Sequence, residues 1–172
     1  MTNNYTRAAL TIAFLACILA ANYVTTHLGM VPVGFGLIAT AGTYFAGLTF
    51  VLRDSLQDVA GKRWTLSAIA AGAALSFLVS DPFIALASAV AFALAELADL
   101  AVYTPLRKRG YIRAAIASNI VGALVDTIVF LWIAGFPILA ALPGQMVGKL
   151  LVTAVAVIAV ATIRATRKTA AA

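Results

Sequence analysis

Acidic residues are rare in this chain, and two of them lie inside one apolar run. Glu96 and Asp99 stand three residues apart in "AELADLAVYTPLRKR" at 95–109, and Tyr103 follows four residues later. On an α-helix the spacing i, i+3, i+7 places the three side chains on one face. Carboxylates inside an apolar helix cost free energy to insert into a membrane, so we expect them to face the interior and to have a function there.

Two later runs carry polar residues at similar spacing. Asn119, Gly122 and Asp126 repeat the spacing i, i+3, i+7, and Gln145 and Lys149 stand at i and i+4. The glycine is expected to let two helices approach closely. Three consecutive helices thus each offer a polar stripe. We predict that the stripes form one shared site, suited to a small, flat, hydrogen-bonding solute rather than a simple ion.

A purely structural interpretation of these residues stays open. Asp126 and Lys149 could be an ion pair between neighbouring helices, and Asn119 and Gln145 could hold helices together by hydrogen bonds. The acid pair of the first run is harder to explain in this way, because Lys149 is the one basic residue at depth against three acids. At least one acid is then protonated or awaits the donors of a ligand.

The composition sets the class of protein. Of the 172 residues 63% are hydrophobic and 10% are charged, with a mean hydropathy of +1.03. Soluble domains are about half apolar and about a quarter charged, so this chain is predicted to be an integral membrane protein. The net charge of +6 comes from basic residues between apolar runs, so no nucleic-acid binding is expected. Cys17 is the one cysteine, which excludes a disulfide framework and a thiolate zinc site, and we expect no metal or cofactor.

The apolar runs predict a single all-α domain over residues 1–172, a bundle of six transmembrane helices. A run must cover about 30 Å at about 1.5 Å per residue, and glycine and proline mark the breaks between runs. The third run is short for a full crossing. The predicted spans lie near 8–26, 34–52, 65–80, 83–104, 112–134 and 139–163.

The basic residues predict the orientation of the bundle. Eleven of the twelve Lys and Arg residues precede the first span or follow the second, fourth and sixth, the exception being Lys149. The positive-inside rule therefore places both termini in the cytoplasm. No organelle signal is visible, so we expect a multi-pass protein of the bacterial cytoplasmic (inner) membrane. Four polar residues follow the second span at the membrane boundary and are compatible with a solvated face or with a gate: Arg53, Asp54, Gln57 and Asp58.

The sequence argues against an enzyme. No glycine-rich phosphate loop is present, so the chain does not itself use ATP, and a single histidine excludes an HExxH zinc site. Asp126 stands in "GALVDT" and not in the Gly-x-Gly-Asp setting of an intramembrane aspartyl protease. A serine protease lacks a base. We therefore expect no catalysis.

The three polar runs together resemble a known family. "AELADLAVYTPLRKR", "ASNIVGALVDTIVFLWIAGF" and "QMVGKLL" are similar to the vitamin-uptake-transporter-like (VUT) family of queuosine precursor transporters. Its fourth span has Gln or Glu three residues before Asp, its Ser/Asn-rich fifth span has an Asp, and its sixth has a Lys. The matching residues here are Glu96, Asp99, Asn119, Asp126 and Lys149.

Weaker matches and two departures complete the comparison with the family. "AANYV" supplies Asn22 and Tyr23 in the first span, and "FVLRDSLQD" supplies Asp54 after the second. The connection "SDP" at 80–82 is tighter than we expect for the family, and Glu96 stands where the family often has Gln.

The resemblance implies uptake of a 7-deazaguanine, either 7-cyano-7-deazaguanine or its 7-aminomethyl counterpart. Glu96 or Asp99 would then accept hydrogen bonds from the N–H and amino group of the ring as a fork. Asn119, Gln145 or Lys149 would donate to its carbonyl, Tyr103 or Phe130 would stack on the ring, and Asp126 with Lys149 would orient the ligand or close the path. Secondary or gating residues would be Asn22, Tyr23, Asp54, Gln57 and Phe130.

Two other functions remain alternatives. The chain could be the substrate-binding membrane subunit of an ATP-driven vitamin importer, which would need a separate ATPase. It could also be a small structural or pore-forming membrane protein whose charges only join helices. The sequence leaves open a homo-oligomer, an ATPase partner, and proton-coupled against downhill transport.

Overall fold

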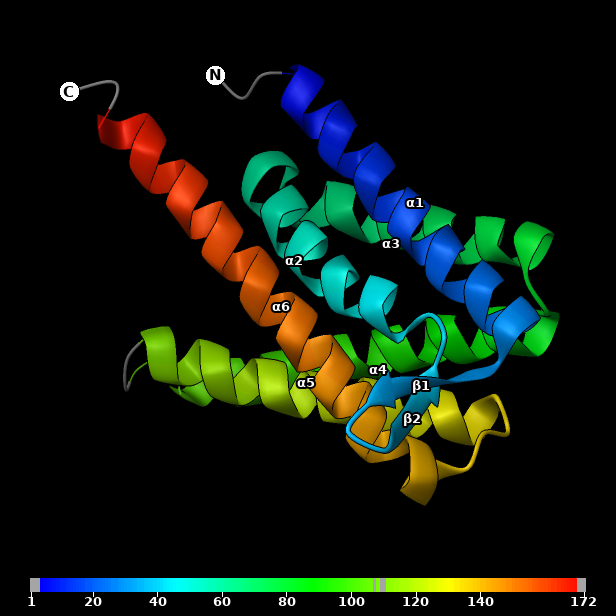
Figure 1. Cartoon of the computed structure of the whole chain (residues 1–172). Helices are drawn as coiled ribbons and strands as arrows, with labels where there is room; N and C mark the ends of the chain where they lie inside the picture. Colours follow the sequence, from blue (N-terminus) through cyan, green and yellow to red (C-terminus); the bar gives the residue numbers. More distant parts are fainter. Residues whose placement is uncertain (1–3, 107, 109–110, 170–172) are drawn as a thin grey trace.

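The computed structural model describes residues 4–106, 108 and 111–169 of the chain. These residues form six α-helices and one short antiparallel hairpin (Figure 1). In chain order the elements are α1 (Asn4–Leu28), β1 (Met30–Gly34), β2 (Leu37–Thr40), α2 (Thr43–Ala60), α3 (Lys62–Val79), α4 (Pro82–Leu106), α5 (Tyr111–Ile133) and α6 (Ile138–Thr169).

The hairpin corrects the prediction of a purely helical chain with a second span over 34–52. Gly34, Phe35 and Gly36 all have positive φ angles, of 93°, 53° and 73°. L-residues are strained there, so a right-handed helix cannot run through this segment, and the chain turns instead. β1 and β2 pair on either side of the turn, and the helix begins only at Thr43.

α2 begins beside the last two turns of α1 and not level with its end. The backbone N–H of Gly42 donates to Thr25 Oγ1 at 3.0 Å, and the carbonyl oxygen of Ala21 lies so close to Gly42 that a Cβ would collide with it. Ala21 is seven residues before the end of α1, so α2 begins about 10 Å short of that end. The hairpin fills the remaining space and packs on α6. Non-helical backbone at such depth is tolerated where protein covers it or where it lines a cavity.

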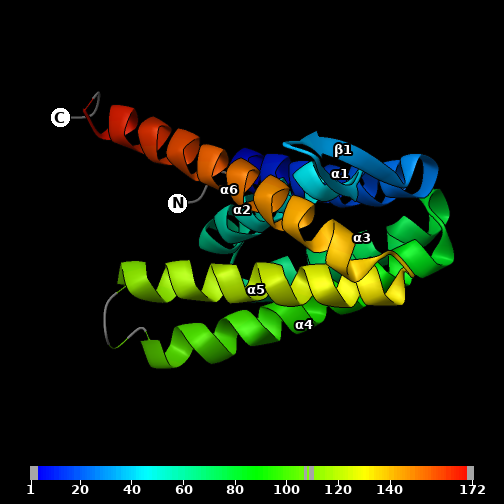
Figure 2. The same ribbon diagram turned by 60° about the horizontal axis from the view of Figure 1, so that its bottom comes forward.

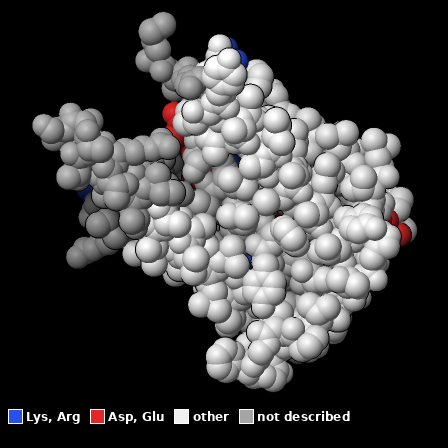
Figure 3. All heavy atoms as spheres, turned by 45° about the horizontal axis from the view of Figure 1, so that its top comes forward, with Lys and Arg blue, Asp and Glu red and all other residues white. Residues whose placement is uncertain are grey.

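Four helices are long and apolar enough to cross a membrane. They are α1, α4, residues 116–133 of α5 and residues 138–156 of α6. Figure 3 shows a face of the molecule that is almost free of charged atoms, as lipid contact requires. α2 and α3 have 18 residues each and carry charged side chains, and only Gly61 separates them. That α2 and α3 also cross the membrane, which makes six spans, remains a prediction.

The tight connection at 80–82 has a local cause. Pro82 is the first residue of α4, where its missing N–H costs nothing. The Asp81 carboxylate caps the helix, since its Oδ1 accepts from the backbone N–H groups of Phe83 at 2.8 Å and Ile84 at 3.3 Å. Pro105 was expected to end the fourth span, but it lies inside the last turn of α4.

The helices form two groups that cross at an angle. α4 and α5 lie antiparallel to each other, while α1, α2 and α6 run across them (Figures 1 and 2). Phe14, Leu56 and Ala68 form a core between α1, α2 and α3, and Phe92 of α4 packs against it. The start of α1, the end of α6 and the turn between α2 and α3 lie on the same side of the molecule (Figure 1).

Candidate functional site

A small cavity with mostly apolar walls and several polar side chains lies where the hairpin meets α2. It has a volume of about 50 Å³, and we call it the central cavity. Residues of α1, β2, α2, α4, α5 and α6 line it. The charged side chains of Asp126 and Lys149 share this lining with amides, hydroxyls and three phenylalanine rings. The polar and aromatic lining residues are Asn22, Thr25, Thr40, Thr43, Thr49, Phe50, Ser88, Phe92, Asp126, Phe130, Gln145 and Lys149.

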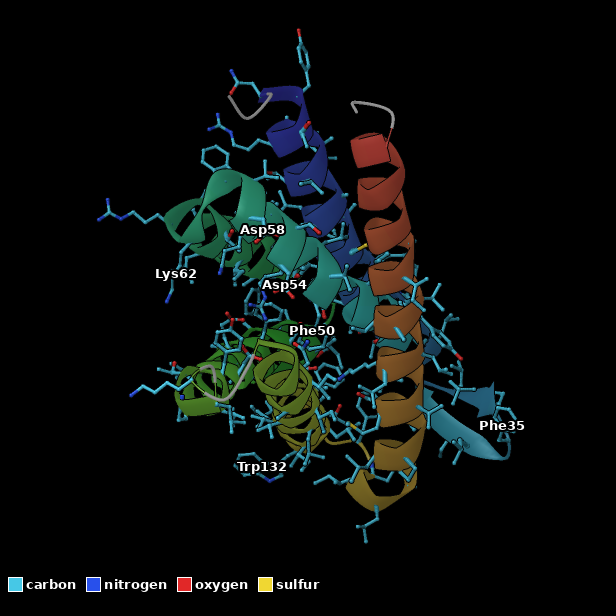
Figure 4. The ribbon with its side chains drawn as sticks, turned by 90° about the vertical axis from the view of Figure 1, so that its left-hand side faces the viewer. Phe35, Phe50, Asp54, Asp58, Lys62 and Trp132 are labelled. Carbon is cyan, nitrogen blue, oxygen red and sulfur yellow. The ribbon has the colours of Figure 1, made fainter. Side chains whose placement is uncertain are left out.

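A second, larger cavity lies between α2, α4 and α5. Its volume is about 290 Å³, and we call it the inner cavity because it borders the turn between α2 and α3. In Figure 4 Phe50, Asp54 and Asp58 follow one another along α2 toward Lys62. Among the described residues its lining consists of polar residue types, with four acids and two bases: Arg53, Asp54, Gln57, Asp58, Lys62, Glu96, Asp99, Tyr103, Ser118 and Asn119.

The structure therefore divides the predicted site into two groups. The central cavity collects Asn22, Asp126, Phe130, Gln145 and Lys149. The inner cavity collects the stripe of α4 with three polar neighbours, namely Glu96, Asp99, Tyr103, Asn119, Asp54 and Gln57. The polar stripe of α5 runs from one cavity to the other, because Asn119 lines the inner cavity and Asp126 lines the central cavity.

Tyr23 lies outside both groups. Its side chain is half exposed, and its ring packs on His27 with centroids 4.1 Å apart. Tyr23 lines neither the central nor the inner cavity. The neighbouring Asn22, by contrast, is buried and donates from Nδ2 to Ser76 Oγ at 2.8 Å, which joins α1 to α3.

Asp126 and Lys149 form a buried ion pair between α5 and α6. Lys149 Nζ donates to Asp126 Oδ2 at 2.6 Å and to Thr127 Oγ1 at 2.9 Å. Both residues of the pair are buried, and both line the central cavity. The ion pair that the sequence allowed as a structural alternative is therefore formed. The same two charged side chains also line the central cavity.

Gln145 ties α6 to the hairpin. Its Nε2 donates to Thr40 Oγ1 at 2.9 Å, and Thr40 in turn lies 3.2 Å from Thr43 Oγ1 at the start of α2. The amide thus holds an interhelical position, as one of the interpretations of the sequence proposed. This hydrogen bond holds the end of β2, which lies before α2 and lines the central cavity.

Arg53 is the centre of the inner cavity's charges. Its Nη1 donates to Glu96 Oε1 at 2.9 Å and lies 3.1 Å from Asp54 Oδ1. Arg53 is only 7% exposed. Its Nε is buried and has no hydrogen-bond acceptor among the described residues. Glu96 therefore already has a cationic partner, which the sequence prediction did not assign to it.

Gly122 does not have the role predicted for it. It faces α4, but a Cβ at this position would lie 3.5 Å from the Ala95 carbonyl oxygen and 3.6 Å from Asp99 Cβ, which are ordinary van der Waals distances. The glycine that a close helix crossing does require is Gly47 of α2, where a Cβ would lie 2.9 Å from the Lys149 carbonyl oxygen.

Sequence reasoning found only part of the contribution of α2. It named Arg53 with Asp54, Gln57 and Asp58 as a solvated face or a gate, but it did not pair Arg53 with Glu96 and did not consider Phe50. The signal was present, because Phe50, Arg53, Asp54 and Gln57 stand at i, i+3, i+4 and i+7, one face of a helix. The threonines of the central cavity gave no such signal, since they come from three separate elements.

The chain matches one protein-family model. The family model described as "Putative vitamin uptake transporter" matches residues 79–165, which comprise α4, α5 and most of α6. No curated protein and no solved structure matches the chain. The matched region is just over half of the chain and includes every predicted residue of spans four to six. The chain has several helices apolar enough to span a membrane and is a multi-pass membrane protein. The chain belongs to the family of putative vitamin uptake transporters.

Proposed function

We propose that this protein imports a 7-deazaguanine precursor of queuosine across the cytoplasmic membrane and binds it in the inner cavity. The observation that carries the proposal is a polar cavity of about 290 Å³ inside an apolar bundle, lined by Glu96 and Asp99. Small-molecule sites have roughly 300–1,000 Å³, so this cavity has the size for one bicyclic base. The central cavity, at about 50 Å³, holds only a few waters at about 10–15 Å³ each.

The chemistry of the inner cavity supports such a solute. A guanine-like ring presents an N–H and an amino group side by side, which one carboxylate can accept as a fork. Asn119 can donate to the ring carbonyl, and Tyr103 offers an aromatic face in the same cavity. Phe130 lines the central cavity, so stacking on it belongs to a different step of transport from binding in the inner cavity.

The charge of the inner cavity narrows the class of solute further. Among the described residues, its lining has four carboxylates against two basic side chains. An excess of negative charge disfavours anionic vitamins and favours a neutral or cationic base. The neutral 7-cyano and the cationic 7-aminomethyl compound both meet this condition.

The test is the thermal stability of the detergent-purified protein with each deazaguanine, with guanine as the comparison ligand. A ligand that binds only the folded state raises stability by about 2.7 kcal/mol at a hundredfold excess over Kd. Glu96→Gln removes a charged hydrogen-bond partner worth about 1.5–3 kcal/mol, so the affinity should fall roughly 10- to 150-fold. Asp81→Asn, which lies outside both cavities and can still cap α4, is the matched control and should retain binding.

Two results would contradict the proposal. If neither deazaguanine stabilises the protein, the solute is a different one or the charges serve only structure. If Glu96→Gln and Asp99→Asn variants both bind and take up the base as well as the native protein, the inner cavity is not the binding site. Uptake only in the presence of co-purifying ATPase subunits would support the importer-subunit alternative instead.

A further inference from the structure

The two cavities are separated by four side chains in two layers. Phe50 and Phe92 stack with ring centroids 6.1 Å apart and an interplanar angle of 13°, and both rings line the central cavity. One helical turn further along, Arg53 and Glu96 form their ion pair at 2.9 Å and line the inner cavity. Each layer joins α2 to α4.

These layers lie in the path between the cavities. A small void of about 10 Å³ lies between them and is lined by Phe50, Arg53, Glu96 and Asp99 among others. Phe50 therefore borders the central cavity on one side and this void on the other. Arg53, Glu96 and Asp99 border the void and also the inner cavity. The two layers thus lie between the cavities on the side of α2 and α4, and residues of α5 line the void as well.

The connection between α2 and α4 is one that can open. α2 packs closely on α1 and α6, whereas among the described residues its backbone makes no comparable approach to α4. Long side chains alone bridge the two helices here. Arg53 also has a second acceptor on its own helix, since Nη1 lies 3.1 Å from Asp54 Oδ1. If Glu96 is taken away, the guanidinium keeps a partner, and the cost of leaving a buried charge unpaired is reduced.

We propose that Arg53 and Glu96, with Phe50 and Phe92 behind them, form a gate between the inner and central cavities, and that a solute whose N–H donors take Glu96 from Arg53 opens it. The N–H groups of a guanidinium lie in one plane, like the N–H and amino group of a guanine-type ring. A fork from the ring would use both oxygens of Glu96, and one of them, Oε1, accepts from Arg53 Nη1, so the ring and Arg53 compete for Glu96. The identity of the solute rests on the proposed function, but the gate itself does not.

Thiol accessibility tests the gate without any substrate. Cys17→Ser removes the one native cysteine, and Ser88→Cys then places a reporter on α4 in the wall of the central cavity. Purified protein reacts with a small methanethiosulfonate reagent, and the labelling rate is measured. We expect Arg53→Gln to raise the rate at least tenfold and Arg63→Gln, an exposed arginine nearby, to leave it unchanged. A reporter at Gln57→Cys, in the inner cavity, should react equally fast with and without Arg53→Gln.

A second variant keeps the test decisive if Arg53→Gln fails to fold. Phe50→Ala removes the apolar layer and should likewise raise the labelling rate at position 88. An unchanged rate in a folded Arg53→Gln protein, or in a folded Phe50→Ala protein should Arg53→Gln not fold, would overturn the gate.

Added base separates the gate from the proposed substrate. With 7-aminomethyl-7-deazaguanine we expect faster labelling of the native gate and no further increase in Arg53→Gln. If Arg53→Gln accelerates labelling but the base neither binds nor accelerates it, the gate stands and the proposed substrate is wrong. If the base stabilises the protein yet leaves labelling unchanged, the substrate stands and opening through Glu96 is refuted.

Discussion

At the scale of single residues, the buried charges have two kinds of surroundings. Lys149 and Asp126 are enclosed on nearly all sides and satisfy each other directly at 2.6 Å. Glu96 is only half-buried and shares one guanidinium with Asp54. The first arrangement is a closed pair, whereas the second leaves Glu96 Oε2 without a partner among the described residues. This difference is why we place the ligand at Glu96.

The closed pair predicts a clear pattern of stability. Lys149→Met leaves the Asp126 carboxylate buried without a cation and should lower the free energy of unfolding by about 3–5 kcal/mol. The double variant Lys149→Met, Asp126→Leu removes both charges and should recover most of that loss. Denaturant unfolding in detergent measures both. A double variant no more stable than Lys149→Met would mean that the pair's surroundings, not the unpaired charge, cause the loss.

At the scale of elements, α6 is the helix against which α2 and the hairpin are fixed. Gly47 of α2 meets the backbone of Lys149, and Gly144 of α6 lies against the carbonyl oxygen of Ile38, where a Cβ would collide. Glycine at both sites allows backbone to touch backbone, which no side chain would permit. α2 and α6 therefore pack as one unit, and the looser contact of α2 with α4 is where the bundle can part.

Two glycines serve as a matched pair for this packing. Gly47→Ala puts a Cβ 2.9 Å from the Lys149 carbonyl oxygen, so the helices must shift, and we expect a loss of about 1–3 kcal/mol in stability. Gly122→Ala meets its nearest atom at 3.5 Å and replaces a mid-helix glycine, so stability should stay equal or rise by up to about 1 kcal/mol. Melting temperatures in detergent compare the two. Equal losses would show that α4 and α5 need a glycine after all.

At the scale of the whole molecule, the charged helices α2 and α3 decide the number of membrane crossings. Their turn lies on the same side as the start of α1 and the end of α6 (Figure 1), which agrees with six crossings and with basic residues gathered on one side. The hairpin lies at the opposite side, with Phe35 at its tip 94% exposed.

Cysteine labelling in cells tests this topology. In the Cys17→Ser background, Phe35→Cys should react with a membrane-impermeant maleimide added to intact cells. Arg63→Cys, beside the turn of α2 and α3, should react only after the membrane is permeabilised, because the positive-inside rule places it in the cytoplasm. Labelling of both positions from outside would mean that α2 and α3 do not cross the membrane.

The sequence by itself determined the class of protein, four strongly apolar helices, the turn chemistry at Pro82 and Gly61, and the family. These features depend on local composition and spacing, which hydropathy and periodicity report directly. Only the tertiary structure decided which polar residues share a cavity. Asn119 and Asp126 lie on one helix face, but seven residues separate them by about 10 Å along the axis, so they border different cavities.

The partner of Arg53 was likewise beyond the sequence. Arg53 and Glu96 are 43 residues apart in the sequence, and which side chains meet depends on how their helices cross. The hairpin before α2 was hidden for a related reason. Its strands are as apolar as a span, and it is held at depth by Gln145 and by the close contact of Gly144, both of α6. Hydropathy marks what is buried, but contacts between distant segments decide where the chain turns and what the cavities contain.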